Sequence, residues 1–268
     1  MRLRDTAYAK LNLALHVRGK LTDGRHALET IFAFCEDGDE VSVAPADDFG
    51  LTVDGPFAAG LASGVDNLVL RAATALQRIA GVSDGAQIQL TKNLPVASGI
   101  GGGSADAAAT MRLLTKLWAV DPELSTSVAP ELGSDVPACL LSLPCKGTGG
   151  GEALEPLNLT GVSGAPVLLV NPLVTLPTGT VFAKWNGSDG GPVDNWRDAR
   201  NDLETAATEI VPAVRGILDW LRDQEGSSFA RMSGSGATCF AIFPDLALRD
   251  RAAQAVPSHW WRLATRLR

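Results

Sequence analysis

The sequence predicts an α+β protein of two lobes, in which strand-like and helix-like segments follow one another along the chain. Its 268 residues, 46% of them hydrophobic and 20% charged, can bury more core than one small domain needs. Residues 8–17 alternate between two faces as a strand does, whereas apolar side chains recur at helical spacing through residues 107–118. A second lobe is expected to begin near Ala165.

The first strand places two polar side chains on one face. Leucine and valine occupy the other face of residues 8–17, and Lys10 and Asn12 lie side by side. A lysine on a strand is commonly solvated, but Asn12 and the apolar flanks favour a buried polar pair. Asp23-Gly24 is a favoured hairpin turn and predicts a returning strand. Strands are therefore expected at residues 31–35, 39–45 and 50–54.

A glycine-dense loop enters an alanine-rich helix at residues 94–108. The strand pattern of residues 87–90 precedes it, and a helix is expected to start at Ser104. Glycines let backbone N–H groups converge on an anion, and a helix N-terminus adds unpaired amides and the positive end of its dipole. The loop lacks the Gly-Lys-Ser/Thr of a Walker motif and the dinucleotide fingerprint. It predicts a different phosphate cradle, the alternative being a flexible connection before a capped helix.

The remaining chain supplies a second helix junction and a second small-residue loop. One helix is expected to stop at Gly133, and the next to start with Asp135 as N-cap and Pro137 in its first turn. The other loop spans residues 232–237. A helix opening at Asn67, a turn at 147–151, a strand at 167–170, a polar loop at 185–192, one helix over 203–221 and a strand at 238–243 complete the expected elements.

Composition argues against several classes of partner. The formal net charge of −7 and the pI near 5.0 disfavour a nucleic-acid or anionic-membrane surface. The four cysteines are scattered, which predicts neither a zinc site nor a disulfide framework. No uninterrupted apolar run could span a bilayer. A cytoplasmic monomer or weak homodimer acting on a small molecule is the expectation.

Three segments together resemble the motifs of the GHMP kinase superfamily, in its chain order: Ala9-Lys10-Leu11-Asn12, residues 95–108 and Ser233-Gly234-Ser235-Gly236. The resemblance implies a ribosomal-protein-S5-like N-terminal domain over residues 1–160 and a ferredoxin-like C-terminal domain over 161–268. Asp23-Gly24-Arg25-His26, Asp66-Asn67-Leu68 and residues 132–137 also look like one branch of this superfamily. That likeness implies transfer of the ATP γ-phosphate to the 2-hydroxyl of a cytidine diphosphate-linked methylerythritol, a step of nonmevalonate isoprenoid biosynthesis.

The resemblance implies Asp135 as the catalytic base and Lys10 as the residue that orients it and balances charge. A hydroxyl is a poor nucleophile, so a carboxylate that accepts its proton suits phosphoryl transfer. A helix N-terminus and a nearby ammonium would both favour the charged form of Asp135. An ordinary helix cap is the alternative interpretation of Asp135.

For ATP, the loop amides are expected to wrap the phosphates. The resemblance places three residues near the adenine: Asn67, Leu68 and Lys92. Asn67 could equally cap its helix, and Lys92 could be a simple charge at a strand end. Mg²⁺ is expected with ATP, although the sequence does not identify its ligands. The predicted ATP-binding residues are Asn67, Leu68, Lys92, Pro95, Val96, Ala97, Ser98, Gly99, Ile100, Gly101, Gly102, Gly103, Ser104 and Ala105.

The acceptor residues are also implied by the resemblance, with one departure. Where the family has an aromatic residue stacking on cytosine opposite Phe182, this chain has Arg25, whose planar guanidinium can also stack on a base. His26 matches the cytosine-reading histidine, or else is an exposed hairpin-tip side chain. The predicted substrate-binding residues are Asn12, Arg25, His26, Thr178, Phe182, Ser233, Gly234, Ser235 and Gly236, with Asn201 on weaker grounds.

Three other functions stay open from the sequence. Another kinase of the superfamily would act on homoserine, mevalonate or a sugar, and Arg25 keeps that alternative alive. A noncatalytic nucleotide-binding homologue should have lost Lys10 or Asp135, which are both present. A decarboxylase of related fold would also consume ATP, but would release carbon dioxide.

Overall fold

The computed structural model describes residues 2–59, 61, 64 and 66–268. Two compact units are built from interleaved stretches of the chain. Unit 1 comprises Met1–Ala9, Asp37–Val96 and Gly101–Ser142, and unit 2 comprises Lys10–Glu36, Ala97–Ile100 and Leu143–Arg268. The long strands β1 (Leu3–Lys20) and β2 (His26–Ala46) each contribute residues to both units. A family-domain boundary at residues 160/161 stays a prediction.

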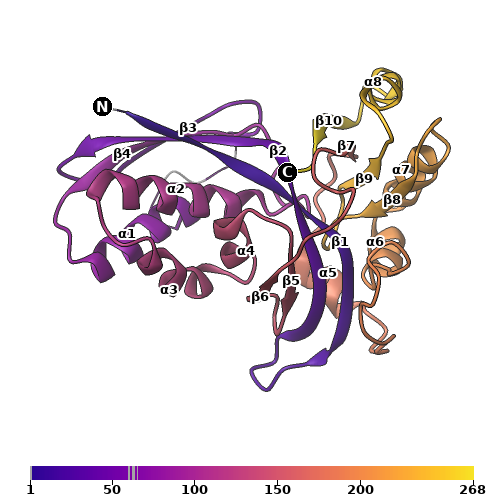
Figure 1. Cartoon of the computed structure of the whole chain (residues 1–268), viewed down its shortest axis with the longest axis horizontal. Helices are drawn as coiled ribbons and strands as arrows, with labels where there is room; N and C mark the ends of the chain where they lie inside the picture. The colour runs from indigo at the N-terminus through magenta and orange to yellow at the C-terminus, as the bar shows by residue number, and fades with distance from the viewer. Residues whose placement is uncertain (1, 60, 62–63, 65) are drawn as a thin grey trace. The chain divides into compact units, whose positions relative to one another are not determined.

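Unit 1 is a small sheet with helices on one side. Strand β4 (Gly85–Thr91) pairs antiparallel with β2 and parallel with β3 (Gly50–Asp54). The four helices gather beneath these strands in Figure 1. They are α1 (Leu68–Ala80), α2 (Gly102–Trp118), α3 (Glu123–Leu132) and α4 (Val136–Leu141). Apolar side chains on the facing surfaces, including Ile88, Leu90, Leu76 and Met111, are buried.

Two sequence expectations in unit 1 need correction. Helix α2 starts at Gly102, two residues before the predicted Ser104, because Gly101 adopts a left-handed conformation at its N-cap (φ 67°). The separate strands predicted at 31–35 and 39–45 are one strand, β2. Gly38 lies within this strand and lets β1 approach closely, because a Cβ at position 38 would lie 1.9 Å from the carbonyl oxygen of Ala7 on β1.

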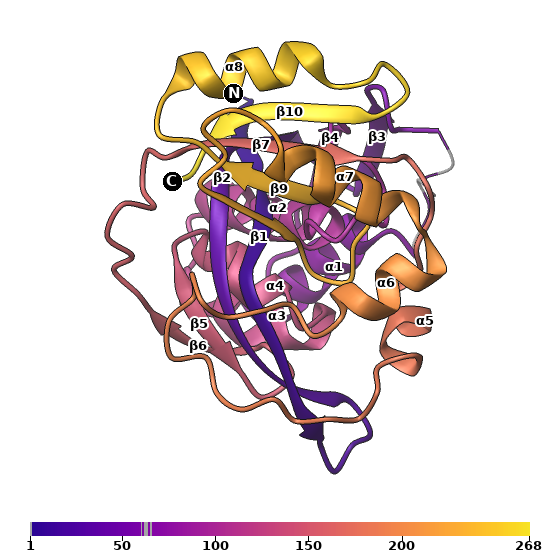
Figure 2. The same ribbon diagram turned by 90° about the vertical axis from the view of Figure 1, so that its right-hand side faces the viewer.

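Unit 2 contains a four-stranded antiparallel sheet in the order β10-β7-β9-β8. Helices intervene after its first and third strands, so the topology is the ferredoxin-like one that the resemblance implied. Figure 2 shows α8 lying along β10. The elements are β7 (Pro166–Asn171), α5 (Thr178–Ala183), α6 (Glu204–Ile210), α7 (Ala213–Arg222), β8 (Phe229–Met232), β9 (Cys239–Ile242), α8 (Leu246–Ala255) and β10 (Trp261–Arg266). Two short strands, β5 (Cys145–Thr148) and β6 (Ala153–Pro156), pair with each other, and β5 pairs with β2.

The single helix predicted over residues 203–221 is wrong. It is divided into α6 and α7, because Pro212 has no N–H to continue the ladder and becomes the N-cap of α7. The apolar stripe of α7 nevertheless enters the core of unit 2, where Val214, Ile217 and Leu221 are fully buried.

Two expectations from composition can be compared with the structure. All four cysteines are buried, and none of the four is in a disulfide. Within the described part of the chain, no helix is both long and apolar enough to cross a bilayer.

Candidate active site

Strand β1 carries Lys10 and Asn12 into the interior of unit 2. Lys10 is 3% exposed, and its Nζ donates to Asn12 Oδ1 at 2.8 Å. The ammonium also lies 5.5 Å from the ring centroid of Phe32. Asn12 is fixed in turn, because its Nδ2 donates to Thr30 Oγ1 at 2.8 Å. The predicted buried polar pair is confirmed, and the solvated-lysine alternative is wrong.

The two small-residue loops predicted from distant parts of the sequence meet in unit 2. Ser233 Oγ donates to the carbonyl oxygen of Gly99 at 2.9 Å and accepts a hydrogen bond from the backbone N–H of Asn12 at 3.2 Å. Gly99 has φ 79°, and a Cβ there would lie 2.5 Å from the Ser233 carbonyl oxygen. The close approach of the two loops therefore requires glycine at position 99.

The other members of the Ser233–Gly236 loop are also held by hydrogen bonds. Asn201 is 6% exposed and donates through Nδ2 to the carbonyl oxygens of Met232 and Gly234, both at 2.8 Å. The hydroxyls of Thr178 and Ser235 are 2.9 Å apart. Asn201, expected as a possible substrate contact, thus has both ends of its amide committed to the backbone, since its Oδ1 accepts from Leu203 N.

In unit 1, Lys92 is enclosed between two carboxylates. Its Nζ donates to Asp39 Oδ2 and, at 2.7 Å, to Asp106 Oδ2, and the Lys92 side chain is 3% exposed. Lys92 directly follows β4, so the strand-end alternative stands, with the charge buried in ion pairs. Sequence reasoning missed both carboxylates, although a charged residue inside the alanine run 105–109 was a signal that Asp106 had a buried partner.

Burial raises the pKa of Asp106 to about 7, and the charge of Asp39 acts in the same direction against the opposing effect of Lys92. Burial also disfavours the charged form of Lys92, but the two carboxylates outweigh it and raise the pKa of Lys92. Lys92 thus contacts a carboxyl group, Asp106, that takes up a proton near neutrality.

This shifted carboxyl predicts a pH-dependent stability. The pKa of Asp106 in the folded chain lies above its ordinary 3.8, so its contribution to folding is complete below about pH 4 and is lost as the pH rises towards 7. Asp106→Asn imitates the protonated carboxyl. We expect it to flatten the slope of the free energy of unfolding against pH, between pH 4 and 7, by about 1 kcal/mol per pH unit. Urea unfolding of both proteins across this range measures it. An unchanged slope would contradict the assignment.

Asp135 lies at the junction predicted for it. Helix α3 ends before Gly133, and α4 follows Asp135 with Pro137 in its first turn. The Asp135 side chain makes no capping hydrogen bond to α4, so it is not the ordinary helix cap of the alternative interpretation. Asn67, in contrast, does cap α1, because its Oδ1 accepts the Val69 amide at 2.9 Å.

The hairpin tip forms an aromatic group in unit 2. His26 stacks on Phe182 with ring centroids 4.7 Å apart, and Trp185 meets His26 edge-on at 5.7 Å. His26 is half-buried, and burial, assisted by Lys20, lowers its pKa. The exposed-histidine alternative is therefore wrong. Trp185 is a further aromatic residue that the sequence reasoning left in a polar loop.

Arg25 points its charge at carboxylates. Its Nε donates to Asp23 Oδ2 at 2.8 Å, and its two terminal nitrogens donate to the carboxylate of Glu152 at 3.2 and 3.3 Å. These contacts raise the pKa of Arg25, first through Asp23 and then through Glu152. The guanidinium is thus oriented by Glu152, directly before β6, and by Asp23 of the hairpin, although its side chain is half exposed.

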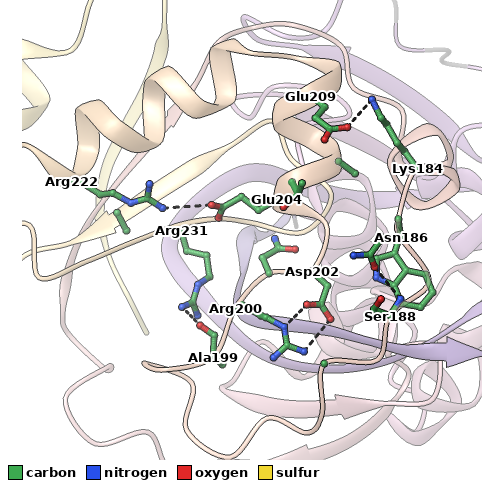
Figure 3. A pocket seen from close by; sticks show the side chains of 16 residues that line it. Lys184, Asn186, Ser188, Ala199, Arg200, Asp202, Glu204, Glu209, Arg222 and Arg231 are labelled. Carbon is green, nitrogen blue, oxygen red and sulfur yellow. Dashed lines mark hydrogen bonds and ion pairs between the residues drawn. The ribbon is translucent and has the colours of Figure 1, made fainter.

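A cavity of about 570 Å³ lies in unit 2 beside Trp185 and Asn201. Figure 3 shows its wall of paired charges: Lys184 with Glu209, Arg222 with Glu204, and Arg200 with Asp202. Arg231 instead donates to the backbone carbonyls of Leu13, Trp196 and Ala199. None of these charged residues was predicted from the sequence.

Among the described residues, no group of three or more His, Cys, Asp or Glu side chains could hold a metal ion. The acidic pair Asp39 and Asp106 is occupied by the Lys92 ammonium.

Two family models match the chain. They describe the GHMP kinases N terminal domain, over residues 67–142, and the GHMP kinases C terminal domain, over residues 193–261. A protein of Rhizorhabdus wittichii called 4-diphosphocytidyl-2-C-methyl-D-erythritol kinase is 49% identical to the chain, covering 98% of this chain and 94% of that protein.

Solved structures give the same picture. A crystal structure of 4-(cytidine 5'-diphospho)-2C-methyl-D-erythritol kinase superposes with a TM-score of 0.84 at 31% identity, covering 99% of each chain. A homoserine kinase from Cytophaga hutchinsonii superposes with a TM-score of 0.73 at 15% identity, covering 99% of this chain and 95% of that one. The second likeness shows a shared fold alone.

Proposed function

Because the chain belongs to the GHMP kinase family, and within it to the 4-diphosphocytidyl-2-C-methyl-D-erythritol kinases, we propose that it phosphorylates the 2-hydroxyl of 4-diphosphocytidyl-2-C-methyl-D-erythritol with ATP. The observation that carries the proposal is the 49% identity over 98% of the chain with a relative of that name. The products are ADP and the 2-phosphate of the acceptor, made in the nonmevalonate route to isoprenoids.

In the proposed reaction, the oxygen of the acceptor's 2-hydroxyl bonds to the γ-phosphorus of ATP, and Asp135 accepts the proton of that hydroxyl. The bond between that phosphorus and the β,γ-bridging oxygen breaks, and ADP leaves. Asp135 suits this role because it is the carboxylate at the junction of α3 and α4, the position to which the family resemblance assigns the base. A base held within hydrogen-bond reach of the hydroxyl contributes roughly 10²–10⁴-fold to the rate.

Lys10 supplies positive charge where the transferred phosphoryl group develops negative charge. Its buried ammonium is held at 2.8 Å by Asn12, so little reorganisation is needed when charge appears. The Ser233 hydroxyl and Gly99 backbone lie in the same hydrogen-bonded set as Asn12. We therefore assign Asn12 and the Ser233–Gly236 loop to the acceptor and the transferred phosphate.

ATP is assigned to the glycine loop and the first turn of α2. The first amides of a helix have no intrahelical partners and favour phosphate. Gly101 and Gly102 open α2 without side chains that would cover those amides. Mg²⁺ is proposed to accompany the nucleotide, where it neutralises phosphate charge, with most of its ligands from phosphate oxygens and water.

The cytidine end is assigned to His26, Phe182 and Arg25. The His26 and Phe182 rings stack on each other at 4.7 Å, so a cytosine would stack on an outer face of this pair rather than between the two rings. Arg25 stands where the family has an aromatic wall, and its contacts with Asp23 and Glu152 hold the guanidinium in place. A planar guanidinium so held can cover one face of a base.

The decisive test measures ADP release with diphosphocytidyl-methylerythritol, homoserine and mevalonate as separate acceptors. We expect ADP, together with a new phosphomonoester seen by ³¹P NMR, with the first acceptor alone. Activity confined to homoserine or mevalonate would overturn the acceptor assignment. Carbon dioxide release would indicate a decarboxylase, and nucleotide binding without turnover would indicate a noncatalytic homologue. Asp135→Asn is the control for contaminating kinases.

A further inference from the structure

Three ionisable side chains from separate elements are buried against one another in unit 1. Asp39 comes from β2, Lys92 follows the last residue of β4, and Asp106 lies in α2. Their side chains are 0%, 3% and 4% exposed. We call them the acid–lysine cluster. Burying charges costs several kcal/mol per ion before their attraction is counted, so such a cluster is a weak source of stability.

The cluster is bonded to one end of the predicted ATP loop. Asp39 Oδ1 accepts the backbone amides of Asn93 and Leu94, at 2.6 and 2.8 Å. These are the two residues that directly follow Lys92 and lead into the loop. The carboxylate of Asp39 therefore holds both the side chain of Lys92 and the backbone that follows it.

The cluster also lies against the other end of the loop. A Cβ on Gly102, the first residue of α2, would lie 3.0 Å from Lys92 Nζ and 3.6 Å from Asp39 Oδ2. An ammonium at the positive end of a helix dipole is unfavourable without compensation. Asp106, one turn into α2, supplies that compensation at 2.7 Å from Lys92 Nζ.

We propose that the acid–lysine cluster is a positioning device for ATP, in which Asp39 and Asp106 fix residues 93–94 and the first turn of α2 through the Lys92 ammonium. The inference rests on the proposed use of ATP but not on the identity of the acceptor. Neither carboxylate touches the nucleotide. Their effect is to hold the phosphate-facing amides at the spacing that the triphosphate requires.

A cluster that only stabilises the fold would give a different experimental result. Replacing a buried ion pair partner that only stabilises the fold lowers thermal stability and leaves the affinity of the folded protein for its ligand intact. A positioning role lowers the affinity for the phosphate-bearing ligand in protein that is still folded. It also leaves alone the affinity for adenosine, which has no phosphates for the amides to hold.

The test measures binding of ATP, ADP and adenosine by calorimetry, without any acceptor. Asp39 accepts through both oxygens, from Lys92 and from the Asn93 and Leu94 amides, and asparagine has only one oxygen. We therefore expect Asp39→Asn and Asp106→Ala each to weaken ATP and ADP binding about tenfold and adenosine binding less than twofold. Asp106→Asn keeps an oxygen for Lys92 and should stay within about threefold of the unaltered chain. Asp47→Asn, an exposed change just beyond β2, is the matched control and should have no effect.

Equal losses for adenosine and ATP, or unchanged ATP affinity in folded Asp39→Asn and Asp106→Ala, would overturn the proposal. If those two variants do not fold, hydrogen exchange in the unaltered chain decides it. The amides of Asn93 and Leu94 should be protected without nucleotide, and rapid exchange there would refute the clamp. Because binding is measured without acceptor, absence of turnover on diphosphocytidyl-methylerythritol would refute the proposed reaction and leave this inference standing.

Discussion

Asp135→Asn should lower kcat for phosphoryl transfer by about 10²–10⁴-fold, because the amide cannot accept the proton of the acceptor hydroxyl. KM for ATP should change far less than kcat, since the nucleotide is assigned to the glycine loop and α2. Asparagine keeps the size of the side chain and one of its oxygens, so the replacement should leave the thermal midpoint within a few degrees. Steady-state ADP release and differential scanning calorimetry measure these effects.

Asp121→Asn, which alters an exposed carboxylate in the same unit, is the matched control for Asp135→Asn. Retention of kcat within about threefold in Asp135→Asn would remove Asp135 from the proposed chemistry.

Lys10→Met should lower kcat by about 10²–10³-fold, the effect of losing one preorganised donor at a developing negative charge. Methionine fills much of the volume of the lysine stem beside Phe32, so packing changes little. Asn12 Oδ1 loses its donor at 2.8 Å, which costs about 1–3 kcal/mol of folding stability. The protein should therefore remain folded while nearly inactive.

Circular dichroism and thermal unfolding check the fold of Lys10→Met, and ADP release checks its turnover. Lys116→Met is a suitable control, because Lys116 is exposed in the last turn of α2. A variant that loses its fold and its activity together would assign Lys10 to stability. A variant that keeps both would show that the buried ammonium takes no part in transfer.

Local patterns predicted much of the fold, because they depend on neighbours in sequence. The strand at Gly50–Asp54 and the junction at Gly133 need only alternation and a helix stop to be recognised. Elements with weak patterns were missed: α8 has only two buried side chains, Ala252 and Ala253, and β10 carries arginines among its apolar residues. Pro212 indicated a break between α6 and α7, but the apolar residues at helical spacing on both sides of it favoured one continuous helix.

The candidate site was predictable where its residues share a strand or a loop. Lys10 and Asn12 are two residues apart on β1, so alternation alone placed them together. Asp39 and Lys92 are 53 residues apart, and Lys92 and Asp106 are 14 apart, so their contact depends on tertiary packing. Arg25 shows the same limit, since no local pattern joins it to Glu152 across 127 residues.

The interleaving of the two units has a consequence for how this gene can be divided or rearranged. Strand β1 takes hydrogen-bond partners from residues almost 200 positions later. The Leu15 backbone N–H donates to the carbonyl of Arg200, and the Leu15 carbonyl accepts from the Asp202 backbone N–H. Arg268 likewise donates its amide to the carbonyl of Phe34 on β2. A chain cut before residue 200 therefore leaves β1 without these partners, and one cut before residue 268 leaves β2 without this one.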